Sequence, residues 1–87
     1  MSNELSDVKK IQIIEITLNT FLIEGKSPPR TSEGLMKIFD GCGDKDEIIR
    51  WFNDGKIKWI KDMKDPTPNT EYHYSMNSAM VNYLTNT

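Results

Sequence analysis

Side chains that commonly do chemistry are scarce in this 87-residue chain. His73 is its single histidine and Cys42 its single cysteine. A metal site would therefore need three carboxylates gathered from elsewhere, and no Ser, His and Asp pattern indicates a nucleophilic triad. Gly41-Cys42-Gly43 is too short for a phosphate-binding loop and lacks the Lys-Ser/Thr that follows one, so it indicates a turn. We expect a non-catalytic protein with no metal and no cofactor.

Length and composition favour one small domain over residues 1–87. Apolar residues make up 37% of the chain, which is not a disordered composition, although a chain of this size buries only a modest core. Residues 1–6 are polar and are expected to fray. No stretch resembles a signal peptide or is long enough to cross a membrane, so we expect no membrane contact and a cytoplasmic location.

Charge is unevenly distributed along the chain. The net charge of −2 is not typical of a nucleic-acid binder. Residues 27–55 carry four basic and six acidic residues, a net charge of −2, whereas residues 56–87 carry four lysines and three acids, a net charge of +1. The basic excess therefore follows the acidic one, in the last third of the chain.

The first predicted helix begins at Ser6 or Asp7 and ends near Gly25. Its apolar residues recur in steps of three and four, which is typical of one helical stripe. Ile13 and Ile16 widen this stripe, so we expect the helix to be buried on more than one side.

Two further helices are predicted before residue 55. A Pro-Pro connector leads to the second, which is capped by Thr31 or Ser32. The third spans residues 44–53, begins at the capping Asp44, and is expected to place Trp51 and Phe52 in the core.

A β-hairpin is predicted after the third helix. Residues 56–63 and 71–76 alternate in polarity with a period of two, as half-buried strands do. Residues 64–70 contain two prolines and suit the loop between the strands. The lone histidine, His73, is expected on the hairpin surface. A last short helix is predicted from Asn77 or Ser78 onward.

This order of elements resembles the winged helix-turn-helix superfamily, loosely in the manner of the DNA-binding domain of the bacterial SOS repressor. The similarity spans residues 8 to 76. It implies an α+β fold, a small winged helix with three helices, a two-stranded β-hairpin wing and a short C-terminal helix. The stretches that match are Gly25-Lys26-Ser27-Pro28-Pro29, the connector, and Asn53-Asp54-Gly55-Lys56-Ile57, the step from the third helix into the wing.

The first functional hypothesis is a DNA-binding transcriptional regulator. The resemblance implies that the third helix enters the major groove and that the hairpin contacts the phosphates of double-stranded DNA. A homodimer is expected under this hypothesis, because so small a module buries little surface on DNA. The hairpin lysines would equally serve to protect an edge strand. The residues assigned to DNA contact are Arg30, Lys45, Arg50, Lys58, Lys61 and Lys64.

The acidic third helix favours a second hypothesis, a protein-binding inhibitor or adaptor that occupies a basic site on a larger protein. Carboxylates in the predicted groove-facing positions would repel DNA phosphates. A stand-alone acidic chain of this length is also typical of phage-encoded accessory proteins. Helix capping and a solvated helix face explain the same acids equally well. The residues assigned to the protein partner are Asp44, Asp46, Glu47 and Asp54.

Overall fold

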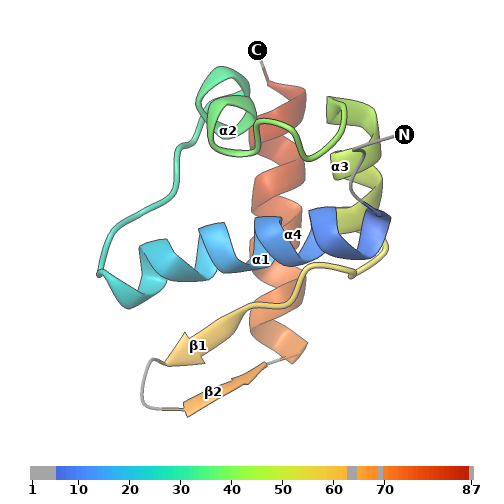
Figure 1. The fold of residues 1–87 in the computed structure, drawn as a ribbon. Coiled ribbons are helices and arrows are strands. Elements are labelled where there is room, and N and C mark those ends of the chain that lie inside the picture. Colours follow the sequence, from blue (N-terminus) through green and yellow to red (C-terminus); the bar gives the residue numbers. More distant parts are fainter. Residues whose placement is uncertain (1–5, 63–64, 69, 87) are drawn as a thin grey trace.

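The fold is built from four helices and a small β-ribbon. A computed structural model of the chain describes residues 6–62, 65–68 and 70–86. In Figure 1, α1 lies across α4, and α2 and α3 lie on either side of α4. The elements follow in the order α1 (Asp7–Ile23), α2 (Ser32–Ile38), α3 (Lys45–Asn53), β1 (Ile60–Asp62), β2 (Asp65–Pro68) and α4 (Thr70–Thr85).

The first three helices begin at capping residues, which confirms their prediction. Each N-cap has an extended backbone, and its side-chain oxygen accepts a hydrogen bond of 2.9 to 3.2 Å from the backbone N–H three residues later. Such a bond satisfies one of the N–H groups that a helix leaves unpaired in its first turn. The three caps are Ser6, Thr31 and Asp44.

The end of α3 depends on a glycine. Gly55 has a φ of 69°, a left-handed conformation that glycine adopts without strain. This conformation lets the N–H of Lys56 donate to the Trp51 carbonyl at 2.9 Å and the N–H of Gly55 donate to the Phe52 carbonyl at 3.1 Å. The paired bonds are those of a Schellman motif, which stops the helix and turns the chain toward residue 57.

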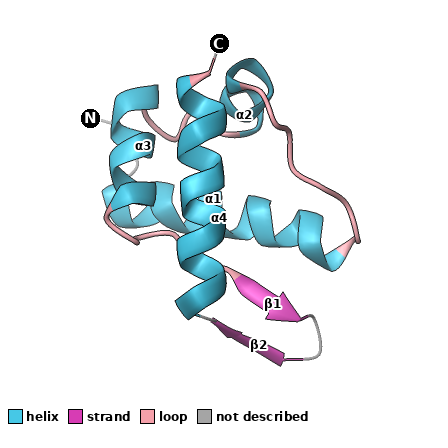
Figure 2. Cartoon of the chain, turned by 180° about the vertical axis from the view of Figure 1, so that it is seen from behind, coloured by secondary structure: helices cyan, strands magenta, loops and turns pink. Residues whose placement is uncertain are grey.

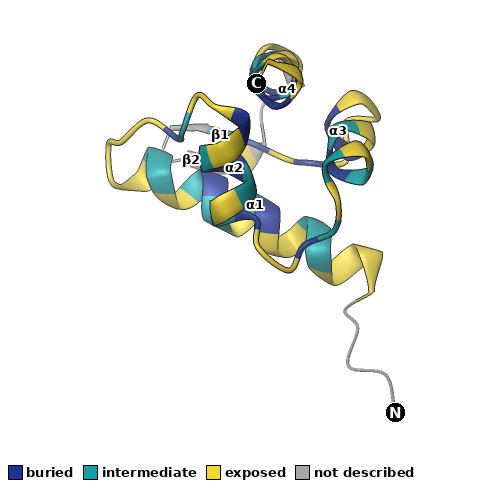
Figure 3. Ribbon diagram, turned by 90° about the horizontal axis from the view of Figure 1, so that it is seen from above, coloured by how far each residue is buried: buried dark blue, intermediate teal, exposed yellow. Residues whose placement is uncertain are grey.

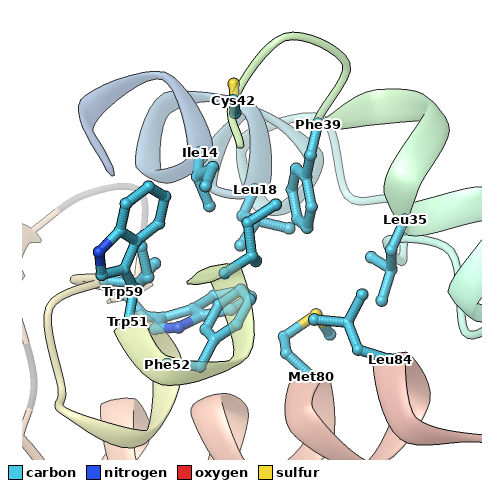
Figure 4. Close-up of a cluster of buried hydrophobic side chains, with 12 residues drawn as sticks. Ile14, Leu18, Leu35, Phe39, Cys42, Trp51, Phe52, Trp59, Met80 and Leu84 are labelled. Carbon is cyan, nitrogen blue, oxygen red and sulfur yellow. The ribbon is translucent and has the colours of Figure 1, made fainter. Parts of the chain in front are cut away.

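All four helices contribute to one hydrophobic core. Figure 4 shows side chains of α1, α2, α3 and α4 pointing toward one another. Trp51 and Phe52 are 7% and 1% exposed, so their predicted place in the core is confirmed. The fully buried members, each at most 1% exposed, include Ile14, Leu18, Leu35, Phe39, Ile48, Phe52, Ile57, Trp59, Met80 and Leu84.

Residues 57–60 form an extended segment held between α1 and α4, which we call the clamped segment. On the α1 side, Glu15 Oε2 accepts the Lys58 N–H at 2.9 Å. The side-chain amide of Asn19 makes two hydrogen bonds to the segment. It donates to the Lys58 carbonyl at 2.9 Å and accepts from the Ile60 N–H at 3.1 Å.

On the α4 side, the clamped segment is held by a histidine and an asparagine. His73 Nε2 lies 2.9 Å from the Trp59 carbonyl, which can only accept, so this nitrogen carries the proton. The indole N–H of Trp59 donates to Asn77 Oδ1 at 2.7 Å, and Asn77 Nδ2 lies 3.5 Å from the Ile57 carbonyl. Side chains therefore satisfy backbone groups that a neighbouring strand would satisfy in a sheet.

The expected α+β winged helix is wrong. Among the described residues, strand structure is limited to the three residues of β1 and the four residues of β2, at one end of α4 (Figure 2). Residues 71–76, expected to form the second strand of the wing, belong instead to the first turns of α4. Met76, Met80 and Leu84 are separated by steps of four, as on one side of a helix. The prediction divided this pattern between a strand that ended at residue 76 and a helix that began after it, so the helical spacing was not recognised.

The second strand of the ribbon, β2, lies in the stretch predicted as a loop, residues 64–70, whereas β1 lies within the first predicted strand. β1 and β2 pair antiparallel, with Ile60 opposite Pro68 and Asp62 opposite Asp65. Prolines are tolerated in β2 because each strand of a two-stranded ribbon has one open edge. Of the first predicted strand, residues 56–63, only 60–62 are a strand, and residues 63 and 64 lie outside the described part of the chain.

The expectation that α1 is buried on more than one side is also wrong. Ile16 is 67% exposed and Ile13 is 37% exposed, while Ile14 and Leu18 are fully buried. Exposed residues recur along the helix in the view of Figure 3. The reason is that α1 packs one side against the core, and the described elements leave its opposite side uncovered.

Replacing Asn77 by Ala should lower the free energy of unfolding by about 1 to 3 kcal/mol, because the buried indole N–H of Trp59 would lose its acceptor. Urea denaturation followed by tryptophan fluorescence measures the loss. Ser75→Ala is the control, since Ser75 is an exposed residue of the same helix. Equal stability of the two variants would show that the Trp59–Asn77 bond does not hold the fold.

Candidate functional site

A groove lies between the end of α3 and the first half of α4. Its volume is about 580 Å³. We call it the α3–α4 groove. It is lined by residues 52–55, by Lys58, and by residues 73, 74, 77 and 78 of α4. A concave surface of this size, with a buried apolar residue beside polar groups, is typical of a binding site.

The deep part of the groove is fixed by the core and by the clamped segment. Phe52 is 1% exposed and belongs to the hydrophobic core. Asn77 is 6% exposed and is held by its bonds to Trp59 and Ile57. A partner would therefore meet a surface whose shape exists before binding, which reduces the entropy lost on association.

The edges of the groove carry exposed polar and aromatic side chains. Asp54 and Lys58 are exposed, and His73 is half-buried. Tyr74 is 80% exposed, the largest exposed fraction among the big apolar or aromatic side chains that the structure describes. An aromatic ring left in water beside a groove indicates a contact surface more than a structural role.

The four acids predicted to face a protein partner fall into two pairs. Asp44 caps α3 through its bond to the Glu47 N–H, and Glu47 lies 3.9 Å from Lys10 of α1. Gly43 leaves room for that carboxylate, because a Cβ there would lie 2.8 Å from Glu47 Oε1. Asp46 and Asp54 are both exposed; Asp46 lies in the first turn of α3, and Asp54 follows its last residue and lines the α3–α4 groove.

The basic residues predicted to bind DNA are spread over several elements. Arg30 lies in the connector between α1 and α2, where it lines a hollow with Met80 and Tyr83 of α4. In Figure 1 this connector runs on the side of α4 away from α3. Lys45 is half-buried, Arg50 is exposed on α3, and Lys58 is exposed in the clamped segment. The side chain of Lys61 and the whole of Lys64 lie outside the described part of the chain.

His73 serves to hold the structure, unlike the surface residue of a hairpin that was expected. It lies on α4, is half-buried, and contacts the Trp59 carbonyl. Within the described residues, no group of three or more His, Cys, Asp and Glu side chains is placed to hold a metal ion. None of the described helices is long and apolar enough to cross a membrane.

Sequence reasoning missed Tyr74 and Asn77 as site residues. Both were assigned to other structures, Tyr74 to the second strand and Asn77 to a helix cap. The sequence did contain a signal for Asn77. It lies three residues before Met80 and seven residues before Leu84, a spacing that places it on the apolar side of a helix. Tyr74 carried no such signal, because its exposure depends on how α4 packs against α3.

Comparisons with known proteins found no match. No protein-family model, no curated protein and no solved structure matches it. The resemblance to the winged helix-turn-helix superfamily therefore stays a prediction, and the function must be inferred from the geometry of the site.

The thiol of Cys42 should be slow to react. The side chain is 1% exposed, and this burial is the main cause that raises the pKa of the thiol above its ordinary value of 9.0. The nearby Asp40 carboxylate raises the pKa further, whereas the positive charge of Lys10 lowers it. Because the thiolate is the reactive form, we expect a disulfide reagent to label the native protein far more slowly than the protein unfolded in guanidinium. Equal rates would contradict the burial of this side chain.

The same shift fixes the direction of a pH effect. In the unfolded chain Cys42 ionises above pH 9, whereas the folded protein still holds the proton. The unfolded state then binds fewer protons, so stability should fall as the pH rises above 9. Urea denaturation at pH 8 and at higher pH measures this fall, and Cys42→Ala should reduce it.

Proposed function

We propose that the protein is a non-catalytic cytoplasmic inhibitor or adaptor that binds a larger protein through α3 and the α3–α4 groove. The observation that carries the proposal is the exposure of Tyr74, 80% of whose surface faces water at the edge of a preformed groove that Asp54 also lines. The DNA-binding hypothesis has weaker support from the same geometry.

Tyr74 has the properties of an interface anchor. Tyrosine offers a large apolar ring with a polar end and has few rotatable bonds, so it gains contact area at a small entropy cost. Aromatic residues of this kind often dominate the binding energy of protein interfaces. In the described structure, Asp54 and Asn53 line the opposite wall of the same groove and can supply polar contacts around the ring.

The charge of α3 favours a basic partner. Residues 44–54 carry four acids and two basic residues, a net charge of −2. Within this stretch Asp54 lines the groove itself, whereas Asp44 caps α3 and Glu47 lies 3.9 Å from Lys10. Opposite charge on a partner would speed association and select its orientation.

Two features weaken the DNA-binding hypothesis. The helix that would enter the major groove presents Asp46 and Asp54 on its exposed side beside Arg50, and carboxylates repel phosphates. Arg30 belongs to the connector between α1 and α2, which runs on the side of α4 away from α3 (Figure 1), so this cation is distant from the helix that would enter the major groove. A basic protein surface tolerates this mixture of charges better than a phosphate backbone does.

A titration with a defined basic probe tests the proposal. We would add a short peptide of alternating arginine and tryptophan to ¹⁵N-labelled protein and follow the amide resonances. We expect the shifts to concentrate on residues 53–55 and 73–78. Tyr74→Ala and Asp54→Lys should each weaken binding at least about tenfold, a change of about 1.4 kcal/mol.

Glu33→Lys is the matched control for Asp54→Lys. It changes the net charge by the same amount at an exposed residue of α2, away from the groove. Equal weakening by the two variants, or tighter binding of duplex DNA than of the peptide at the same salt concentration, would contradict the proposal.

A further inference from the structure

The exposed side of α1 forms a second apolar surface, separate from the α3–α4 groove. Ile16, Ile23 and Ile13 are 67%, 48% and 37% exposed. Five exposed residues of α1 lie between Lys9 and Glu24, and all five are uncharged although charged residues make up 28% of the chain. They are Gln12, Ile13, Ile16, Thr20 and Ile23.

The spacing of these residues is that of a helix-pairing seam. Positions 9, 13, 16, 20 and 23 are separated by steps of four, three, four and three. This alternation averages 3.5 residues and keeps one stripe facing a partner helix, as in coiled coils. The Thr20 hydroxyl donates to the Ile16 carbonyl at 2.6 Å, so its polar group is already satisfied within the helix and its methyl can join the apolar seam.

A hollow lies beside the seam. It has a volume of about 340 Å³ and is lined by α1 residues that include Ile16, Thr20 and Ile23, together with Lys58 and Ile60 next to them. The apolar surface therefore continues from α1 onto the start of β1. Exposed surface of this kind is costly in water and marks an interaction site.

We propose that this seam, residues 9, 13, 16, 20 and 23, pairs antiparallel with the same seam of a second copy of the chain. The seam is self-complementary in charge, because Lys9 lies at one end and Glu24 lies just beyond the other, as suits an interface between two copies related by a two-fold axis. An antiparallel pair whose two-fold axis passes between Ile16 and Thr17 places Ile13 opposite Thr20 of the other copy and Lys9 opposite Glu24 of the other copy. The two copies of Ile16 then lie next to the axis.

Charge selects the antiparallel arrangement over the parallel one. In a parallel pair Lys9 would face Lys9 and Glu24 would face Glu24, and the two helix dipoles would point the same way. In the antiparallel pair opposite charges close both ends of the seam. Glu24 also lies 3.4 Å from Lys26 of its own chain, but both side chains are at least half exposed and are free to exchange partners.

Sedimentation equilibrium over a range of protein concentrations tests the pairing. The chain has a mass of 10.1 kDa, so the pair should weigh about 20 kDa, twice that value. Ile16→Glu should leave only the monomer, because it would place two carboxylates together at the two-fold axis. Ile23→Glu should have the same effect. Val8→Glu is the control, since Val8 is 64% exposed on α1 but lies off the seam.

A charge exchange tests the orientation. Lys9→Glu should weaken the pair, and adding Glu24→Lys should restore it, whereas in a parallel pair the double variant would gain nothing. Circular dichroism checks that each variant keeps its helices. A monomeric native protein at every concentration, a dimer that survives Ile16→Glu, or a double variant that stays weak would overturn the proposal.

Discussion

The rest of the structure depends on the way residues 57–60 are held between α1 and α4. The side chains of Ile57 and Trp59 are fully buried, and the hydrogen bonds of the Trp59 carbonyl and the Ile60 N–H are partly buried. The N–H and carbonyl of Lys58 make their hydrogen bonds nearer the surface. A buried N–H or carbonyl without a partner costs about 1 to 3 kcal/mol. Side chains of both helices remove this cost: Glu15 and Asn19 from α1, His73 and Asn77 from α4. The same bonds fix where the two helices cross (Figure 1).

This clamp also shapes both surfaces proposed for binding. Asn77 holds the Trp59 indole on one side and lines the α3–α4 groove on the other, so the groove keeps its form without a ligand. Lys58 lies between the two surfaces and contributes to both hollows. A partner protein on α3 and a second copy on α1 would then occupy different sides of one rigid unit. The small core of an 87-residue chain gains from such partners, because each covers apolar surface that the monomer leaves in water.

Local signals predicted the first three helices, and long-range contacts decided the rest. Each helix cap bonds an N–H group only three residues further along the chain, so the caps Ser6, Thr31 and Asp44 could be recognised in the sequence. The side chains of Glu15 and Asn19 bond backbone groups that lie 39 to 43 positions further along the chain. No feature of the sequence around Glu15 or Asn19 indicates these partners. Residues 71–76 alternate in polarity and were taken for a strand, but the core contacts of α4 override that pattern. The exposure of Ile16 was missed for the same reason. An apolar residue on a helix indicates that it is buried somewhere, but it does not show whether the same chain or another molecule covers it.

Amide hydrogen exchange at Lys58 and Ile60, measured by NMR, tests the clamp most directly. Both amides donate to side chains of α1 in a segment that lies outside regular secondary structure or at its edge. If the clamp holds the fold together, these two amides should exchange as slowly as the core amides of α1 and α4, because all of them would open only with the whole molecule. If the two amides exchange as fast as those of an open loop while α1 and α4 stay protected, the claim that this segment holds the two helices together is contradicted.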